Sequence, residues 1–164
     1  MCDVSARPFA VPLCASSPRA VASGACAPDR GRVARCVAMN VLLDTCALLA
    51  LAGGELPAGA AVALRKAPEA YVSVVSPWEV AIKVAGGKLR LMTPPVQWFL
   101  GLVERYDLRE VPLDAGVACA AAALPLLHRD PFDRVIVALA QAHGFAVLTS
   151  DENIRKYPGV TTLW

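Results

Sequence analysis

The chain has 164 residues, of which 56% are hydrophobic and 18% are charged, a composition that indicates one folded domain and excludes a mainly disordered chain. Residues 1–38 hold five of the 16 basic and two of the 14 acidic side chains, which leaves 11 basic and 12 acidic side chains for residues 39–164. This balance excludes binding through a broad basic face, because such a face needs many Lys and Arg contacts to phosphates.

Residues 1–38 show neither the helical nor the strand period of hydrophobic residues, and several prolines interrupt them. Met39 is followed at once by the apolar run 40–44. We therefore expect residues 1–38 to be a disordered extension or sequence read upstream of a true start at Met39, with a transit peptide as the remaining alternative. Residues 39–164 are then expected to form the single domain.

The cysteines do not form a metal or disulfide motif. Four of the six lie within residues 1–38 at irregular spacing, without a C-x-x-C pair or an accompanying histidine. Cys46 and Cys119 lie in apolar sequence and are predicted to be small buried residues of a protein in a reducing compartment, which favours a cytoplasmic location. No apolar run reaches the roughly 20 residues of a membrane-spanning helix, so no membrane association is predicted.

From residue 40 onward, short apolar runs rich in β-branched residues alternate with helical patterns. This alternation predicts an α/β fold with a parallel sheet flanked by helices. The predicted strands are 40–44, 71–75, 109–112, 146–149 and 160–164, and the predicted helices are 45–52, 57–66, 77–85, 94–106, 114–124, 131–143 and 151–156.

Four acidic residues lie close to the ends of these strands. Asp44 closes the first strand, Glu79 follows the second, and Asp151 follows the fourth. Asp133 lies at the start of the helix that leads back to the fourth strand. Because the carboxyl ends of parallel strands share one edge of a sheet, the four side chains can converge there.

Helix capping is an alternative explanation for three of these acids. Residues 76–79 have the form of a capping box, with Ser76 at the N-cap and a glutamate at the third helical position. Residues 130–133 have the same form, and residues 149–152 repeat it. Taken singly, these three acids are explained by capping as well as by chemistry. No such cap explains Asp44.

Convergence of the four acids would require a neutralising partner, because carboxylates within a few ångströms repel one another. Few basic residues lie near these acids in the sequence: Lys83 follows Glu79 by four positions, and Arg134 adjoins Asp133. A divalent cation would neutralise the group, and an all-oxygen site suits Mg²⁺ or Mn²⁺ rather than zinc. His128 stands beside the acidic motif and is a candidate for contact with a substrate.

In these motifs, residues 39–164 resemble the PIN-domain ribonucleases and, within them, the VapC-type toxins of type II toxin–antitoxin pairs. The resemblance spans the whole segment. It rests on the order and spacing of Leu-Asp-Thr at 43–45, Pro-Trp-Glu at 77–79, Gly-Lys-Leu at 87–89, His-Arg-Asp-Pro-Phe-Asp-Arg at 128–134 and Leu-Thr-Ser-Asp at 148–151.

This resemblance implies a PIN-like fold, a five-stranded parallel sheet flanked by helices on both faces. It also implies that Asp44, Glu79, Asp133 and Asp151 form a catalytic quartet that binds Mg²⁺ or Mn²⁺. The implied reaction is cleavage of RNA phosphodiester bonds by water that the metal activates.

Four further residues are expected to support the site. Thr149 is expected either to hydrogen-bond a metal ligand or to cap the last helix. Asp130 is expected to act as an N-cap that shapes the acidic loop. Lys83 and Lys88 are candidates for contacts to RNA phosphates, although an exposed pair of Lys83 with Glu79 is the simpler explanation for Lys83.

The resemblance also implies partners, namely an RNA substrate, a cognate antitoxin that covers the active-site groove, and a second copy in a homodimer. Aromatic and apolar residues at 78 and 98–100 fit such an interface, but at this spacing they also fit the core. Two other functions stay open on the residues alone: a catalytically inactive RNA-binding or protein-interaction module, and a metal-dependent phosphatase or DNA nuclease.

Overall fold

The computed structural model describes residues 39–164, and the prediction made for residues 1–38 lies outside this range. Five parallel strands form one sheet in the order β3-β2-β1-β4-β5. The strands are β1 (Val41–Leu43), β2 (Ala70–Ser73), β3 (Leu108–Val111), β4 (Ala146–Leu148) and β5 (Thr161–Leu163). The helices are α1 (Thr45–Gly53), α2 (Ala58–Lys66), α3 (Val75–Ala85), α4 (Pro95–Arg105), α5 (Ala115–Ala123), α6 (Pro131–His143) and α7 (Glu152–Arg155).

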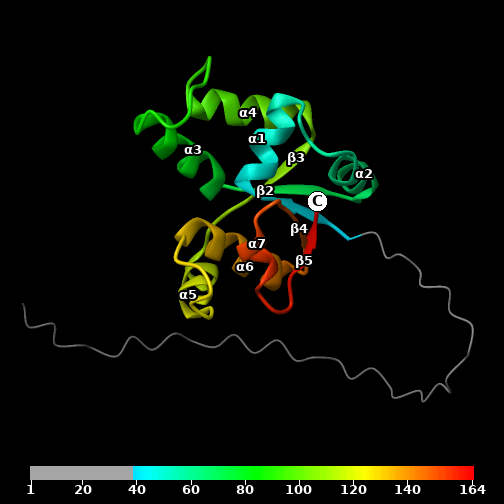
Figure 1. Cartoon of the computed structure of the whole chain (residues 1–164), viewed down its shortest axis with the longest axis vertical. Coiled ribbons are helices and arrows are strands. Elements are labelled where there is room, and N and C mark those ends of the chain that lie inside the picture. Colours follow the sequence, from blue (N-terminus) through cyan, green and yellow to red (C-terminus); the bar gives the residue numbers. More distant parts are fainter. Residues whose placement is uncertain (1–38) are drawn as a thin grey trace, which may run out of the picture. The chain divides into compact units, whose positions relative to one another are not determined.

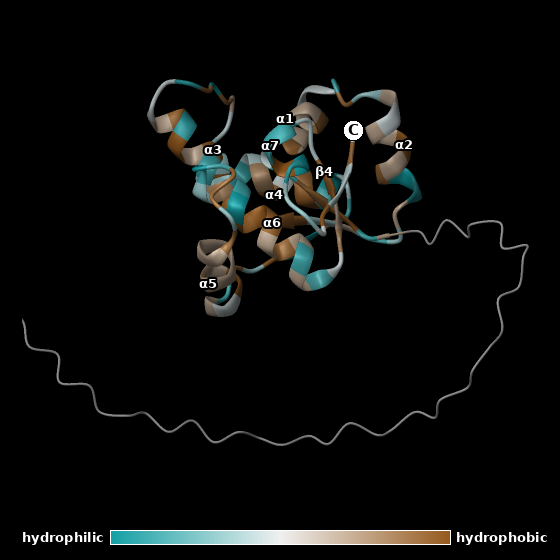
Figure 2. Cartoon of the chain, turned by 60° about the horizontal axis from the view of Figure 1, so that its bottom comes forward, coloured by the Kyte–Doolittle hydropathy of each residue, from teal (hydrophilic) through white to brown (hydrophobic). Residues whose placement is uncertain are grey.

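Helices cover both faces of this sheet, as predicted (Figure 1). Val41 and Leu43 of β1 face a core that α1, α2 and α4 cover, whereas Leu42 between them faces a core that α5, α6 and α7 cover. All three residues of β1 are buried, which is usual for the central strand of a parallel sheet with helices on both sides. Figure 2 shows hydrophobic segments gathered where the strands meet α6.

Glycines end two of the helices that lead away from this sheet. Gly54 caps α1 at φ 72°, and Gly144 caps α6 at φ 67°. Residues other than glycine rarely adopt this left-handed backbone conformation without strain, so glycine is favoured at these two helix ends.

The start of α3 differs from the prediction. Val74 and Val75 were expected to end the second strand, but the chain turns helical at these residues. The Ser73 hydroxyl accepts a hydrogen bond from the Val75 N–H at 3.3 Å, and Val75 is buried. A β-branched run therefore does not distinguish the last residues of this strand from the first turn of a buried helix.

No single helix within residues 39–164 is long and apolar enough to cross a membrane. Only α1 and α2 counted together pass a test of length and composition, and a bend of 103° separates them.

Candidate active site

A cavity of about 280 Å³ opens at the carboxyl ends of the strands. All four acids predicted to form the catalytic quartet line it, together with Asp130 and Lys83. Lys88 is exposed in the turn after α3 and does not line this cavity. The lining residues are Asp44, Thr45, Cys46, Glu79, Lys83, His128, Asp130, Asp133, Ser150 and Asp151.

Asp44 lies between β1 and α1, where no loop separates the two elements. It is the N-cap of α1, because its Oδ1 accepts a hydrogen bond from the Thr45 N–H. The expectation that no cap explains Asp44 is therefore wrong. Its Oδ2 accepts a hydrogen bond from the Thr149 hydroxyl at 2.8 Å and one from the Cys46 thiol at 3.0 Å. With only 4% of the residue exposed, this carboxylate is fixed at the floor of the cavity.

Glu79 differs from Asp44, because the capping box that offered an alternative explanation for Glu79 does not form. Since α3 begins at Val75, Ser76 lies within the helix, and its buried hydroxyl has no hydrogen-bond partner among residues 39–164. Glu79 instead pairs with Lys83 one turn further along α3, at 2.5 Å. Capping therefore does not account for the acid at position 79.

Asp133 lies in the first turn of α6, where its Oδ2 is 2.9 Å from Nδ1 of His128. Asp130 is the N-cap of this helix, as predicted, and its Oδ1 accepts a hydrogen bond from the Phe132 N–H at 2.9 Å. The segment 128–133 thus brings two carboxylates and an imidazole to one wall of the cavity.

Thr149 connects two of the acids. Its hydroxyl donates to Asp44 and accepts a hydrogen bond from the Asp151 N–H at 2.9 Å. Asp151, rather than Thr149, caps α7, because its Oδ1 accepts a hydrogen bond from the Asn153 N–H at 2.7 Å. Thr149 therefore makes the contact to a site carboxylate that was one of its two expected roles, and any effect on a bound cation stays a prediction.

Burial and crowding change the protonation of two of these acids. Burial is the largest cause, and together with the nearby carboxylates Asp44, Asp130, Asp151 and Glu79 it raises the pKa of Asp133 from 3.8 to about 7. Burial also raises the pKa of Asp44, although its hydrogen bonds to Cys46 and Thr149 oppose that effect. The negative charge of the cavity is therefore not balanced by the protein alone.

Few positive groups face this cavity. Lys83 pairs with Glu79, and His128 contacts Asp133. Arg134, predicted as a possible partner of Asp133, turns away and donates to backbone carbonyls, among them those of Leu124 and Pro125. Five carboxylates thus face one lysine and one histidine.

The donor set fits a hard divalent cation. Asp44 Oδ1 accepts a single N–H and keeps a lone pair, and only one oxygen of Asp133 is 2.9 Å from His128. Within residues 39–164, no three His, Cys, Asp or Glu side chains lie close enough together to hold a metal ion on their own. An open arrangement suits Mg²⁺, which usually keeps several waters and takes its remaining ligands from one or two carboxylates and substrate phosphates.

We expect the raised pKa of Asp133 to make the stability of the metal-free protein depend on pH. The pKa of Asp133 is about 7 in the folded protein and 3.8 in the unfolded chain, so at pH values between the two the folded protein binds more protons than the unfolded chain. Its unfolding free energy should fall as the pH rises from about 4 to about 7. Thermal unfolding in EDTA across this range measures the effect, with Asp133→Asn as the comparison. If the stability of the wild-type protein fell with rising pH no more steeply than that of the Asp133→Asn variant, this expectation would be contradicted.

The two cysteines within residues 39–164 differ from their prediction. Cys46 was expected to be a buried hydrophobic residue, yet its thiol lines the cavity and also contacts Ser150. Its place two positions after Asp44, in the first turn at the carboxyl end of β1, is the signal that could have revealed it. Cys119 was likewise expected to be buried, but it lies exposed on α5.

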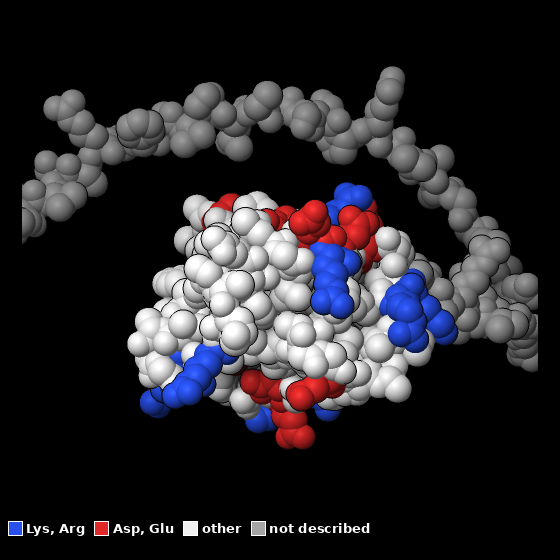
Figure 3. Space-filling model, turned by 90° about the horizontal axis from the view of Figure 1, so that it is seen from above, with Lys and Arg blue, Asp and Glu red and all other residues white. Residues whose placement is uncertain are grey.

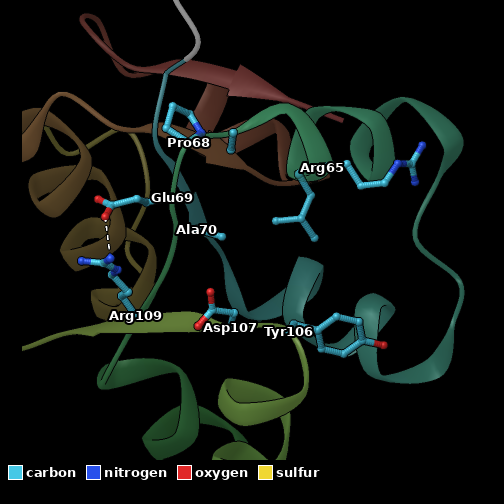
Figure 4. Close-up of a pocket in the computed structure, with 9 residues that line it drawn as sticks. Arg65, Pro68, Glu69, Ala70, Tyr106, Asp107 and Arg109 are labelled. Atoms are coloured by element: carbon cyan, nitrogen blue, oxygen red, sulfur yellow. Dashed lines mark ion pairs between the residues drawn. The ribbon is translucent and has the colours of Figure 1, made fainter.

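A second cavity, of about 340 Å³, lies at the amino ends of β2 and β3 and includes Tyr106 and Asp107. Its two acidic and two basic side chains balance in number, and Glu69 contacts Arg109 at 2.7 Å and accepts a hydrogen bond from Tyr71. Figure 4 shows Glu69 and Arg109 pointing toward one another, with Arg65 directed away from this pair. This cavity lacks the unbalanced charge of the acidic one.

The surface charge agrees with the composition. On the face that Figure 3 shows, Lys and Arg form separate small groups, some of them beside acidic residues, rather than a continuous basic surface. A phosphate-containing ligand would therefore not be held by a broad positive field on this face.

The fold and the acidic cavity define a class of protein, an α/β domain with a carboxylate-rich site at the carboxyl ends of its parallel strands. The sequence profile of the PIN domain family matches residues 41–160. The chain therefore belongs to the PIN domain family, which confirms the resemblance found in the sequence.

Individual relatives agree with this assignment. Ribonuclease VapC22 of Mycobacterium tuberculosis is 33% identical over 113 residues, which are 67% of this chain and 85% of that protein. The crystal structure of VapBC2 from Rickettsia felis, bound to a DNA fragment from its promoter, matches with a TM-score of 0.58 at 14% identity, over 76% of this chain and 97% of that chain. A toxin–antitoxin complex from Klebsiella pneumoniae matches with a TM-score of 0.54 at 22% identity, over 74% of this chain and 96% of that chain. These two structures support the fold.

Proposed function

We propose that this protein is an endoribonuclease that depends on Mg²⁺ or Mn²⁺ and acts as the toxin of a toxin–antitoxin pair. The observation that carries the proposal is the cavity in which five carboxylates face a single lysine and a single histidine. The similarity to a protein named ribonuclease VapC22 supports RNA as the substrate.

In this proposal the side chains of Asp44, Glu79, Asp133 and Asp151 hold the cation. Asp44 is anchored by Thr149, so its free lone pair points to a fixed place in the cavity. Lys83 holds Glu79 and carries positive charge at the cavity wall, where a substrate phosphate would lie. When bound, a divalent cation lowers the pKa of water and offsets the negative charge that develops on the leaving oxygen.

We also infer a homodimer and a cognate antitoxin as partners. Four large apolar side chains are exposed on α3 and α4, namely Trp78, Ile82, Val96 and Leu100, whereas Phe99 is buried in the core. Exposed apolar patches mark interaction sites more often than isolated apolar residues do. The similar structures from Rickettsia felis and Klebsiella pneumoniae are toxin–antitoxin complexes, which supports the same kind of partner here. A cytoplasmic location stays a prediction.

The proposed activity is tested by incubating the full chain with single-stranded RNA and with DNA of the same sequence, in the presence of Mg²⁺ or Mn²⁺. We expect cleavage of the RNA, internal to the strand, and loss of that cleavage in EDTA. Preferential cleavage of DNA would favour a DNA nuclease. The absence of any EDTA-sensitive cleavage would contradict the enzyme proposal and favour a non-catalytic binding module.

A further inference from the structure

His128 makes the only side-chain contact of the Asp133 carboxylate within residues 39–164. Its Nδ1 lies 2.9 Å from Asp133 Oδ2, and the Asp130 N–H points at the same nitrogen from 3.3 Å. A ring nitrogen either donates or accepts, so Nδ1 holds an ionised Asp133 in the form in which it carries a proton and donates to the carboxylate. The imidazole is partly exposed and forms part of the cavity wall. It can therefore act directly on the orientation of Asp133.

The backbone of His128 is held in place by groups outside the cavity. Arg134 donates from Nη1 to the carbonyl of His128 at 3.4 Å and to that of Pro125 at 3.0 Å. Its Nη2 donates to the carbonyl of Leu124 at 2.8 Å. These contacts hold the backbone of the segment that joins α5 to α6, so the imidazole meets Asp133 from a fixed backbone position.

The other three acids of the quartet are each held by a different group. Asp44 is held by Thr149, Glu79 is held by Lys83, and Asp151 is held by the backbone N–H of Asn153. Partners of this kind orient metal ligands and limit the conformational freedom that is lost when a cation binds. His128 is the corresponding partner for Asp133.

We propose that His128 is a positioning residue, whose Nδ1 holds one oxygen of Asp133 so that the other oxygen faces the cavity, where a divalent cation would bind. The proposal rests on the function proposed above. It differs from the roles predicted for the acidic quartet, because His128 acts through Asp133 rather than as a ligand.

The test compares His128→Asn, His128→Gln and His128→Ala in the full chain. The asparagine amide nitrogen can replace Nδ1, whereas that of glutamine reaches the position of Nε2. Mn²⁺ affinity is measured without RNA, from the electron paramagnetic resonance signal of free Mn²⁺. We expect His128→Ala and His128→Gln to weaken Mn²⁺ binding by about 10-fold to 100-fold, and His128→Asn to stay within about threefold of wild type.

Kinetics on single-stranded RNA give a second measurement. At low Mn²⁺, kcat should fall in the alanine and glutamine variants, whereas KM for RNA should change little, because His128 does not bind the substrate in this proposal. His143→Ala is the matched control, because His143 lies at the far end of α6 and stacks on Phe145. This control should leave both Mn²⁺ affinity and kcat unchanged.

The outcomes separate this proposal from the proposed function. If wild type binds Mn²⁺ and cleaves RNA, and His128→Ala binds Mn²⁺ equally well, the positioning role is overturned alone. A His128→Asn variant as weak as His128→Gln would overturn it too, and this comparison still decides if the alanine variant fails to fold. If wild type binds no Mn²⁺, both proposals fall.

Discussion

Replacing Asp133 by Asn should lower kcat/KM for single-stranded RNA by at least about 100-fold, because even residues that only support a metal ligand typically contribute 10-fold to 100-fold. Asp44→Asn should have a similar effect. The stability of the metal-free protein should rise rather than fall. Burial and four other carboxylates raise the pKa of Asp133, so the amide removes a charge that the folded protein holds unfavourably at neutral pH.

The size of this stabilisation follows from the raised pKa. A tenfold change in a protonation equilibrium corresponds to about 1.4 kcal/mol, so a gain of about 1–3 kcal/mol at pH 7.5 is expected once solvent screening is allowed for. Urea denaturation in EDTA measures it. Asp114→Asn is the matched control, because Asp114 caps α5 outside the cavity and asparagine caps equally well. Unchanged cleavage by Asp133→Asn would remove this residue from the quartet.

The sheet could be predicted because its pattern does not depend on distant contacts. A short, wholly apolar run such as Val-Leu-Leu at 41–43 is typical of a strand buried on both faces in a parallel sheet with helices on either side. The ends of α1 and α6 have an equally local cause, because Gly54 and Gly144 adopt a backbone conformation that favours glycine.

The reasons for the acidic positions could not be predicted in the same way. Asp44 was expected to be unexplained by capping and is a cap, whereas the capping box that was the alternative explanation for Glu79 does not form. Both differences arise because helix starts depend on packing. Val75 is buried against the core, so α3 begins before Ser76 and changes the role of every residue in its first turn.

Side-chain direction is the second limit of the sequence. Arg134 directly follows Asp133, yet a step of one residue along α6 turns its side chain toward the core, away from the cavity. His128 is five positions from Asp133 and reaches it, because the loop before α6 folds back. The helical period could have predicted that Arg134 points away from Asp133, whereas the contact of His128 with Asp133 depends on the loop conformation.

Arg134→Ala should destabilise the protein by at least about 3 kcal/mol, because a buried polar group that loses its partner costs about 1–3 kcal/mol and several would do so here. The guanidinium is buried and has no carboxylate partner within residues 39–164. It donates instead to the carbonyls of Ala122 and Leu124 at the end of α5, where the helix dipole favours a positive charge, and to those of Pro125 and His128.

Arg134→Lys is the informative second variant. The lysine ammonium keeps the positive charge but has only three donors at a single nitrogen, so it cannot reach all the carbonyls that the planar guanidinium of arginine contacts. It should recover only part of the lost stability. Arg129→Ala is the matched control, since Arg129 is the exposed arginine of the same motif and should change the unfolding free energy by no more than about 0.5 kcal/mol. If Arg134→Ala and Arg129→Ala had equal effects in urea denaturation, the guanidinium would not be what holds the segment between α5 and α6. The fixed position of His128 beside Asp133 would then need another cause.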